Sequence, residues 1–257
     1  LANRYNIQEE NSFLPAVSYL LLSSLLLIFS PSVVEFIASF FVIFSAYKVL
    51  GFYKTEASAG ALFDAAFFIA IAALFYLPAI VAAVWLLFGV GVLRQFSLRE
   101  WLMLITGLAV PFFLCFTWYF WFDRLPYFFH EFLSMQFIYP GEAFWTTFNL
   151  EMVVLFAFAA VTFFFTMRTA GATTTGNIQL RKYLNLVILL LVISGAGYLI
   201  SGAAVSSALI IAAAPASVIF GFNFAKLPPK IAGIIHLILL ILLLILHYFN
   251  FAGNPFL

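Results

Sequence analysis

Residues 60–93 read GALFDAAFFIAIAALFYLPAIVAAVWLLFGVGVL, with Asp64 as their single charged side chain. This apolar stretch is longer than the roughly 17–25 residues that one membrane-spanning helix needs. Proline disfavours helical conformation in the residue before it, so Leu77-Pro78 predicts a turn near the middle of the stretch. We therefore predict two spanning helices here, at about 60–76 and 78–93, joined by that turn.

The composition extends this interpretation to the whole chain. Hydrophobic residues make up 66% of the 257 residues and charged residues only 8%, whereas soluble domains carry about 25% charged residues. A soluble fold of this size could not bury so much apolar surface, so lipid must act as the solvent. We predict an all-α, polytopic transmembrane helix bundle that forms a single domain over residues 1–257. With the two spans above, about nine are expected, the others lying at about 13–30, 32–50, 101–122, 146–167, 183–200, 203–222 and 231–250.

The Lys and Arg residues predict the orientation of this bundle. All but one of the eleven cations fall on one side of the nine-span arrangement, and only Arg124 falls on the other. Treating residues 60–93 as one span would change the division to seven against four. Because cytoplasmic loops carry the excess of Lys and Arg, we predict a bacterial inner-membrane protein with a cytoplasmic amino end and a periplasmic carboxyl end. The cations on the cytoplasmic side are Arg4, Lys48, Lys54, Arg94, Arg99, Arg168, Arg181, Lys182, Lys226 and Lys230.

Several function classes are disfavoured by composition and motifs. A net charge of +1 lacks the basic field that a nucleic-acid partner requires. The single cysteine, Cys115, excludes an intrachain disulfide and a cysteine-based metal cluster. The chain contains no Walker loop, zinc motif, nucleophile elbow or Rossmann fingerprint. No cofactor is evident from a motif, and a bound lipid or a divalent cation stays open.

The most distinctive stretch lies on the predicted outer side, at 118–131. It contains Asp123, His130 and Glu131, which together with Glu142 form the best cluster of titratable side chains in the chain. Its second half predicts a short interfacial helix. One interpretation is an extracytoplasmic catalytic site, in which a carboxylate acts as base or metal ligand and the histidine assists. The other is an aromatic belt at the membrane interface.

Other charged residues near predicted span ends each allow two interpretations. Glu151 lies about a turn inside its span, where a carboxylate is either functional or close enough to the interface to reach water. Arg99 and Trp101 are expected to anchor lipid head groups and mark the interface, and Arg124 is a third head-group candidate. Glu35 is expected to interact favourably with the positive amino terminus of its helix.

Three further expectations concern how the helices pack. Asp64 is expected to pair with Lys48 or Lys54, and His236 to bond to a neighbouring helix rather than to relay protons. Small residues in the spans at 183–200 and 203–222 predict close helix packing. The Leu- and Ile-rich span at 231–250 lacks such residues and is expected to lie at the periphery, facing lipid.

Three stretches of the amino-terminal half form a distinctive pattern of apolar residues with a few polar anchors. They are Asn3-Arg4-Tyr5 with Asn11-Ser12-Phe13-Leu14-Pro15-Ala16-Val17-Ser18-Tyr19-Leu20, Leu62-Phe63-Asp64-Ala65 with Ala72-Ala73-Leu74-Phe75-Tyr76-Leu77-Pro78, and Leu98-Arg99-Glu100-Trp101 with Gly107-Leu108-Ala109-Val110-Pro111-Phe112-Phe113. This pattern resembles an uncharacterised family of multi-pass inner-membrane proteins from Bacteroidota. The resemblance implies two further helices before Leu1. The layout is also faintly similar to the C-type glycosyltransferases, which use polyprenyl-phosphate sugars and carry a catalytic acid in their first outer loop. That loop is absent from this sequence, so no catalytic residue is carried over.

Two functional hypotheses follow from the sequence. The first is an accessory or structural subunit of a cell-envelope membrane complex, with membrane lipid and other integral-membrane subunits as partners. The second is a membrane enzyme or carrier that handles a lipid-linked sugar or another lipid at the periplasmic face. For that second hypothesis the resemblance makes a polyprenyl-phosphate-sugar-dependent glycosyltransferase the leading expectation. Its catalytic candidates are Asp123, His130, Glu131 and Glu151.

Overall fold

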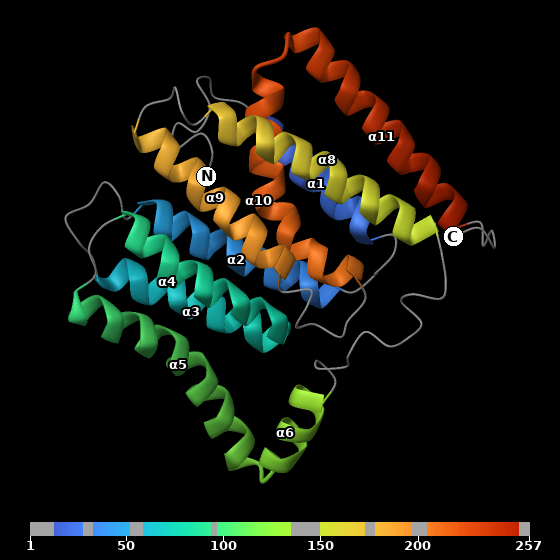
Figure 1. Cartoon of the computed structure of the whole chain (residues 1–257). Helices are drawn as coiled ribbons and strands as arrows, with labels where there is room; N and C mark the ends of the chain where they lie inside the picture. Colours follow the sequence, from blue (N-terminus) through green and yellow to red (C-terminus); the bar gives the residue numbers. More distant parts are fainter. Residues whose placement is uncertain are drawn as a thin grey trace. The chain divides into compact units, whose positions relative to one another are not determined.

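A computed structural model of the chain describes residues 13–27, 33–51, 59–93, 97–134, 150–172, 178–196 and 205–251. All regular elements in these ranges are helical, which confirms the predicted all-α class (Figure 1). They are α1 (Leu14–Leu27), α2 (Val33–Gly51), α3 (Ala59–Phe75), the 3₁₀ turn η1 (Leu77–Ile80), α4 (Val81–Leu93), α5 (Leu98–Trp121), α6 (Leu125–Ser134), α8 (Leu150–Ala172), α9 (Ile178–Ala196), α10 (Val205–Ala225) and α11 (Pro229–Phe251).

The lengths and apolar character of these helices are those of a membrane protein. Within the described residues, four helical segments are long and apolar enough to cross a membrane: Val33–Gly51, Leu98–Trp121, Ile178–Ala196 and Lys230–Tyr248. The remaining predicted spans coincide with shorter apolar helices, which leaves the count of about nine spans a prediction. These shorter helices are Leu14–Leu26, Gly60–Phe75, Leu77–Gly91, Phe156–Gly171 and Leu209–Ala225.

The predicted break at Leu77-Pro78 is confirmed. α3 ends at Phe75, and Tyr76 adopts an extended conformation with φ −139° and ψ 101°. Pro78 lies in the first turn of η1, where its missing N–H is tolerated because that N–H would have no partner inside the helix. Residues 60–93 therefore form two helices rather than one long helix.

The helices pack into two compact units. Unit 1 contains α1, α8, α10, α11 and the part of α9 up to Leu191. Unit 2 contains α2 to α6 and the end of α9. Each unit is described by itself below, and the single domain expected over residues 1–257 stays a prediction.

α3 is the central helix of unit 2, packing against both α2 and α5. Most of its alanines with described exposure are buried, and they let neighbouring backbones come close. The closest approach is at Gly107 of α5, where an added Cβ would lie 2.6 Å from the carbonyl oxygen of Phe63 and 2.8 Å from the Cβ of Ala66. Only glycine fits at this crossing without a backbone shift.

An ion pair also joins α2 to α3. Lys48 Nζ lies 2.6 Å from Asp64 Oδ2, which confirms the predicted pairing of Asp64 and identifies Lys48 as its partner. The two side chains remain 36% and 44% exposed. Exposed ion pairs contribute little net stability because water and salt screen them.

We expect Lys48→Met to change the free energy of unfolding by less than about 1 kcal/mol. A double-mutant cycle with Asp64→Asn, followed by detergent-induced unfolding, measures the coupling between the two side chains. A coupling energy above about 2 kcal/mol would mean that the pair is much more desolvated than its exposure indicates.

α10 is the central helix of unit 1 and is buried along most of its length, as its small residues predict. Against α1, a Cβ added at Gly221 would lie 2.5 Å from Pro15 Cγ, so these helices also touch closely. Against α8, the Asn223 amide donates to Thr169 Oγ1 at 2.7 Å and to the Phe165 carbonyl at 3.3 Å. Gly195 of α9, in the other half of the predicted small-residue seam, has open space around it.

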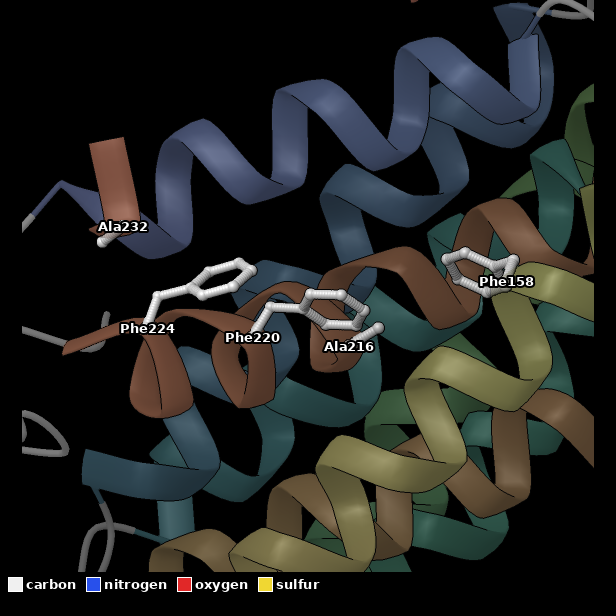
Figure 2. Close-up of a cluster of buried hydrophobic side chains, with 5 residues drawn as sticks. All are labelled: Phe158, Ala216, Phe220, Phe224 and Ala232. Atoms are coloured by element: carbon white, nitrogen blue, oxygen red, sulfur yellow. The ribbon is translucent and has the colours of Figure 1, made fainter. Parts of the chain in front are cut away.

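A hydrophobic cluster connects α8, α10 and α11. Phe220 and Phe224 project one turn apart from the same side of α10, and Ala232 of α11 lies beside them (Figure 2). Phe158 contributes from α8, and Ala216 completes the cluster. Beyond Ala232, most of the α11 side chains with described exposure are exposed, which agrees with the peripheral position predicted for this span.

Candidate functional site

The predicted outer segment forms a helical hairpin of α5 and α6. α5 ends at Trp121, and α6 confirms the short helix expected in the second half of the segment. Asp123 has a φ of 52°, in the left-handed region, and the Arg124 N–H donates to the Tyr119 carbonyl at 2.9 Å. This tight reversal places α6 against the end of α5.

Aromatic side chains hold the hairpin together. Phe128 of α6 is buried, with its ring centroid 4.9 Å from that of Tyr119 and 5.2 Å from that of Phe116. The Phe129 ring stacks on Phe116 at a centroid distance of 5.6 Å and lies 5.9 Å from the Phe128 ring. These contacts orient α6 through aromatic packing against the end of α5.

The predicted catalytic residues are placed only in part. Asp123 and His130 lie on the same hairpin and both are exposed. Glu131 follows His130 on α6, and Glu151 lies in the first turn of α8 in unit 1; for these two the structure describes only the backbone. Glu142 lies outside the described residues. The convergence of these groups into one catalytic site therefore stays a prediction.

A cavity of about 360 Å³ lies at the turn of the hairpin. Its walls are Trp118, Tyr119, Phe122 and Arg124, so three aromatic rings surround a single cationic group. An arginine beside aromatic surface suits an anionic group attached to an apolar body. This is the setting expected of Arg124 as a head-group residue.

The other two head-group candidates lie at the opposite end of α5. Ser97 caps this helix, and its N–H donates to Glu100 Oε2 at 3.1 Å. Glu100 is thereby buried, while Arg99 and Trp101 on either side of it are exposed. The capping interaction explains why the Glu100 side chain points inward. Arg99 and Trp101 are exposed, where they could contact a lipid head group.

Unit 1 contains a second pocket, which we name the α1–α11 groove. Its volume is about 320 Å³. The lining is entirely apolar except for one serine from α1 and one histidine from α11. The residues that line the groove are Ser18, Leu21, Leu22, Leu25, Ala157, Phe158, Val161, Phe220, Phe224, His236, Leu239, Leu242 and Leu246.

The two polar residues of the groove form a pair. His236 Nδ1 lies 2.8 Å from the Ala232 carbonyl oxygen, to which it donates, and this leaves Nε2 to accept a hydrogen bond. Ser18 Oγ lies 3.4 Å from that Nε2. The ring of Phe224 packs edge-on against the imidazole at 4.8 Å. The bond confirms that His236 contacts a neighbouring helix, as its sequence context predicts.

Sequence reasoning singled out His236 but missed Ser18. A signal was present, because Ser18, Leu22 and Leu25 recur at helical spacing on one face of α1. A serine in an apolar helix is common, however, and only the packing of α1 beside α11 shows which partner it meets.

Metal binding finds no support among the described side chains. No three His, Cys, Asp or Glu residues there lie close enough together to hold an ion.

Glu35 is buried at the start of α2, and within the described part of the chain its Oε2 has no hydrogen-bond partner. Its place in the first helical turn agrees with the expected interaction with the helix amino terminus.

Comparisons with protein-family models, curated proteins and solved structures gave no match to this chain. The function must therefore be argued from the two sites themselves. The resemblance to the Bacteroidota membrane-protein family and to the C-type glycosyltransferases stays a prediction from the sequence.

Proposed function

We propose that this chain is a multi-pass protein of the bacterial inner membrane and serves as an accessory or structural subunit of a cell-envelope complex. The observation that carries the proposal is that several polar side chains form contacts between helices. Lys48 bonds α2 to α3, Asn223 bonds α10 to α8, and Ser18 bonds α1 to α11. Asp123 and His130, in contrast, are exposed at the hairpin. Groups that join helices serve assembly, because in lipid they replace water as hydrogen-bonding partners.

The helix directions within unit 1 support the nine-span arrangement. Pro15, near the start of α1, lies against Gly221 near the end of α10, and Leu26 at the end of α1 packs against Ile210 near the start of α10. α1 and α10 are therefore antiparallel. This is the relation that a first and an eighth span must have when successive spans alternate in direction.

The other helices of unit 1 follow the same alternation. Asn223 and Thr169 lie near the ends of α10 and α8, so these helices run in the same direction, as an eighth and a sixth span must. Ser18 and His236 both lie toward the starts of their helices, and α11 runs parallel to α1. A ninth span shares the direction of the first.

In each unit, described cations from two different helices lie toward the same end. The Asn223–Thr169 bond brings Arg168 at the end of α8 to the same end of unit 1 as Lys226. In unit 2, the contact of Gly107 with Phe63 places the start of α5, and thus Arg99, toward the end that holds Lys48.

Arg124 lies at the other end of α5. This helix has 24 residues and is therefore about 36 Å long, enough to cross the roughly 30 Å hydrocarbon core of a bilayer. The cation distribution supports a cytoplasmic side for Arg99 and the other nine cations, and a periplasmic side for Arg124.

A second function is favoured by the cavity at the hairpin. An enzyme or carrier for a lipid-linked sugar or another lipid would use Arg124 and the surrounding rings to hold an anionic, partly apolar substrate. Asp123 and His130 would then lie beside the substrate at the periplasmic face. The leading expectation for such an enzyme is the polyprenyl-phosphate-sugar-dependent glycosyltransferase that the resemblance implies.

Combined replacement of Asp123, His130 and Glu131 by alanine separates the two functions. An accessory subunit should keep its assembly and its function, because neither would depend on a catalytic site at the hairpin. We expect the tagged triple variant, isolated from native membranes in mild detergent, to sediment as the same assembly as the unaltered chain. That assembly is expected to have a protein mass above the 28.7 kDa of the chain alone. The variant should also rescue the defect of a deletion strain.

The matched control replaces Thr106 and Thr117 of α5 by alanine, which also removes polar side chains from exposed positions in unit 2. Loss of rescue by the hairpin variant alone, with normal assembly, would reject the accessory function in favour of the enzyme. Sedimentation of the unaltered protein as a lone chain would reject it as well.

A further inference from the structure

The α1–α11 groove has the length of a hydrocarbon chain. Its α1 wall extends from Ser18 to Leu25 and its α11 wall from His236 to Leu246. At 1.5 Å of rise per residue, the longer wall covers about 15 Å. The volume of about 320 Å³ lies at the lower end of the range for ligand sites. A single narrow chain fits these dimensions better than a bulky ring system.

The groove is polar at one end only. Ser18 and His236 lie at the beginnings of the two parallel walls, and every residue farther along either wall is leucine. His236 Nδ1 lies 2.8 Å from the Ala232 carbonyl oxygen, and its Nε2 lies 3.4 Å from Ser18 Oγ. The pair suits an uncharged polar group such as an ester, since the serine hydroxyl can turn to donate to its carbonyl oxygen.

The groove opens sideways rather than into a closed core. Val161, Leu239 and Leu242 of its lining are 45%, 37% and 50% exposed. Other apolar side chains of α11 are exposed beside them, as expected of a helix that faces lipid. A membrane lipid can therefore enter the groove without unfolding any helix.

Two cations lie beyond the polar end. Lys226 and Lys230 are exposed on either side of the turn between α10 and α11. Lys230 precedes His236 by six residues, about 9 Å along the helix. Lys226 Nζ lies 4.2 Å from the centroid of the Phe222 ring, which holds the ammonium group at this end of unit 1.

We propose that the α1–α11 groove binds one acyl chain of an anionic phospholipid. The phosphate lies at Lys226 and Lys230, the ester linkage at Ser18 and His236, and the chain along the leucines of α1 and α11. Charged, neutral and apolar parts of the protein thus follow one another in the same order as the parts of the lipid. The proposal requires only that the chain lies in a membrane, and it holds for an accessory subunit and an enzyme alike.

Lipid-dependent thermal stability of the purified full chain in mild detergent tests this proposal. Phosphatidylglycerol, phosphatidylcholine with identical chains and a polyprenyl phosphate are each added over a range of concentrations. A ligand that binds the folded protein raises its unfolding temperature in proportion to the logarithm of its concentration. We expect phosphatidylglycerol to bind at least about ten-fold more tightly than phosphatidylcholine, and added salt to reduce the difference.

Two substitutions on α11 test whether the groove is the site. Leu242→Trp places an indole in the groove, whereas Leu244→Trp places it at an exposed position that does not line the groove. We expect the first to weaken phosphatidylglycerol binding about ten-fold or more and the second to leave it unchanged. Equal effects of the two variants would overturn the proposal.

A double substitution tests the end of the groove at which the lipid head group is placed. Lys226→Gln with Lys230→Gln should abolish the preference for phosphatidylglycerol over phosphatidylcholine while keeping the response to chains. Stronger binding of polyprenyl phosphate than of phosphatidylglycerol would overturn the acyl-lipid assignment.

A photoreactive group at the end of the phosphatidylglycerol acyl chain identifies, by crosslinking, where that chain lies in the unaltered protein. Crosslinks at Leu25 or Leu246 are expected, and crosslinks confined to α5 would overturn the proposal. The complementation and sedimentation results do not depend on any of these outcomes, so failure of this proposal and failure of the proposed function are separable.

Discussion

Replacing Gly107 by alanine is expected to destabilise unit 2 by about 1–3 kcal/mol, which is the usual cost of adding a methyl group to a fully packed contact. The new Cβ would lie 2.6 Å from the Phe63 carbonyl oxygen, a backbone atom that cannot rotate away as a side chain can. α5 must therefore move away from α3 or the backbone must distort. Unfolding by denaturing detergent, followed by circular dichroism, measures the loss.

Gly91→Ala is the matched control for this substitution. Gly91 lies in α4 of the same unit, and an added Cβ there would meet no atom within 4 Å. The same change should be neutral there or stabilise by up to about 1 kcal/mol, because alanine favours helix more than glycine does. Equal stability of the two variants would show that α3 and α5 are not in close contact at Gly107.

Gly107 also shows where prediction from the sequence ends. The sequence predicts helices, their approximate ends and the break at Leu77-Pro78, because hydropathy and proline act locally along the chain. It also predicts that Asp64 pairs with Lys48 or Lys54, because these residues lie close together in sequence between consecutive helices, and the structure identifies Lys48 as the partner. The contact of Gly107 with α3 depends on which helices become neighbours, and hydrophobic composition is nearly the same on all of them.

The candidate sites also contain some features that the sequence predicts and others that it does not. The aromatic surroundings of Arg124 could be predicted, because they are a local pattern at a helix end, whereas its head-group role stays a prediction. Ser18 and His236 are 218 residues apart in sequence, so their hydrogen bond could not be anticipated. The packing of the small residues of α9 stays a prediction: Ser194 is buried, whereas Gly195 has open space around it, since glycine permits close approach without causing it.

Single cysteines at three exposed positions are expected to show all-or-none labelling from the periplasm. Cys115 is first replaced by alanine, and Phe122, Ala170 or Ala225 is then changed to cysteine, so that every Lys and Arg is kept. In cells with a permeabilised outer membrane, a membrane-impermeant maleimide should label only Phe122→Cys. Ala170→Cys and Ala225→Cys should react only after the inner membrane is broken.

The physical reason is the cost of moving cations through lipid. Arg168 lies close to Ala170, and Lys226 adjoins Ala225, so each inner cysteine reports the side on which its neighbouring cation stays. Arg and Lys at the centre of a spanning helix cost about 2.5–3.5 kcal/mol each, which is why the side with more cations remains cytoplasmic during insertion. The Asn223–Thr169 bond also requires Ala170 and Ala225 to lie at the same end of unit 1. Periplasmic labelling of both would reverse the orientation of unit 1, whereas labelling of one alone would contradict the packing of α8 against α10.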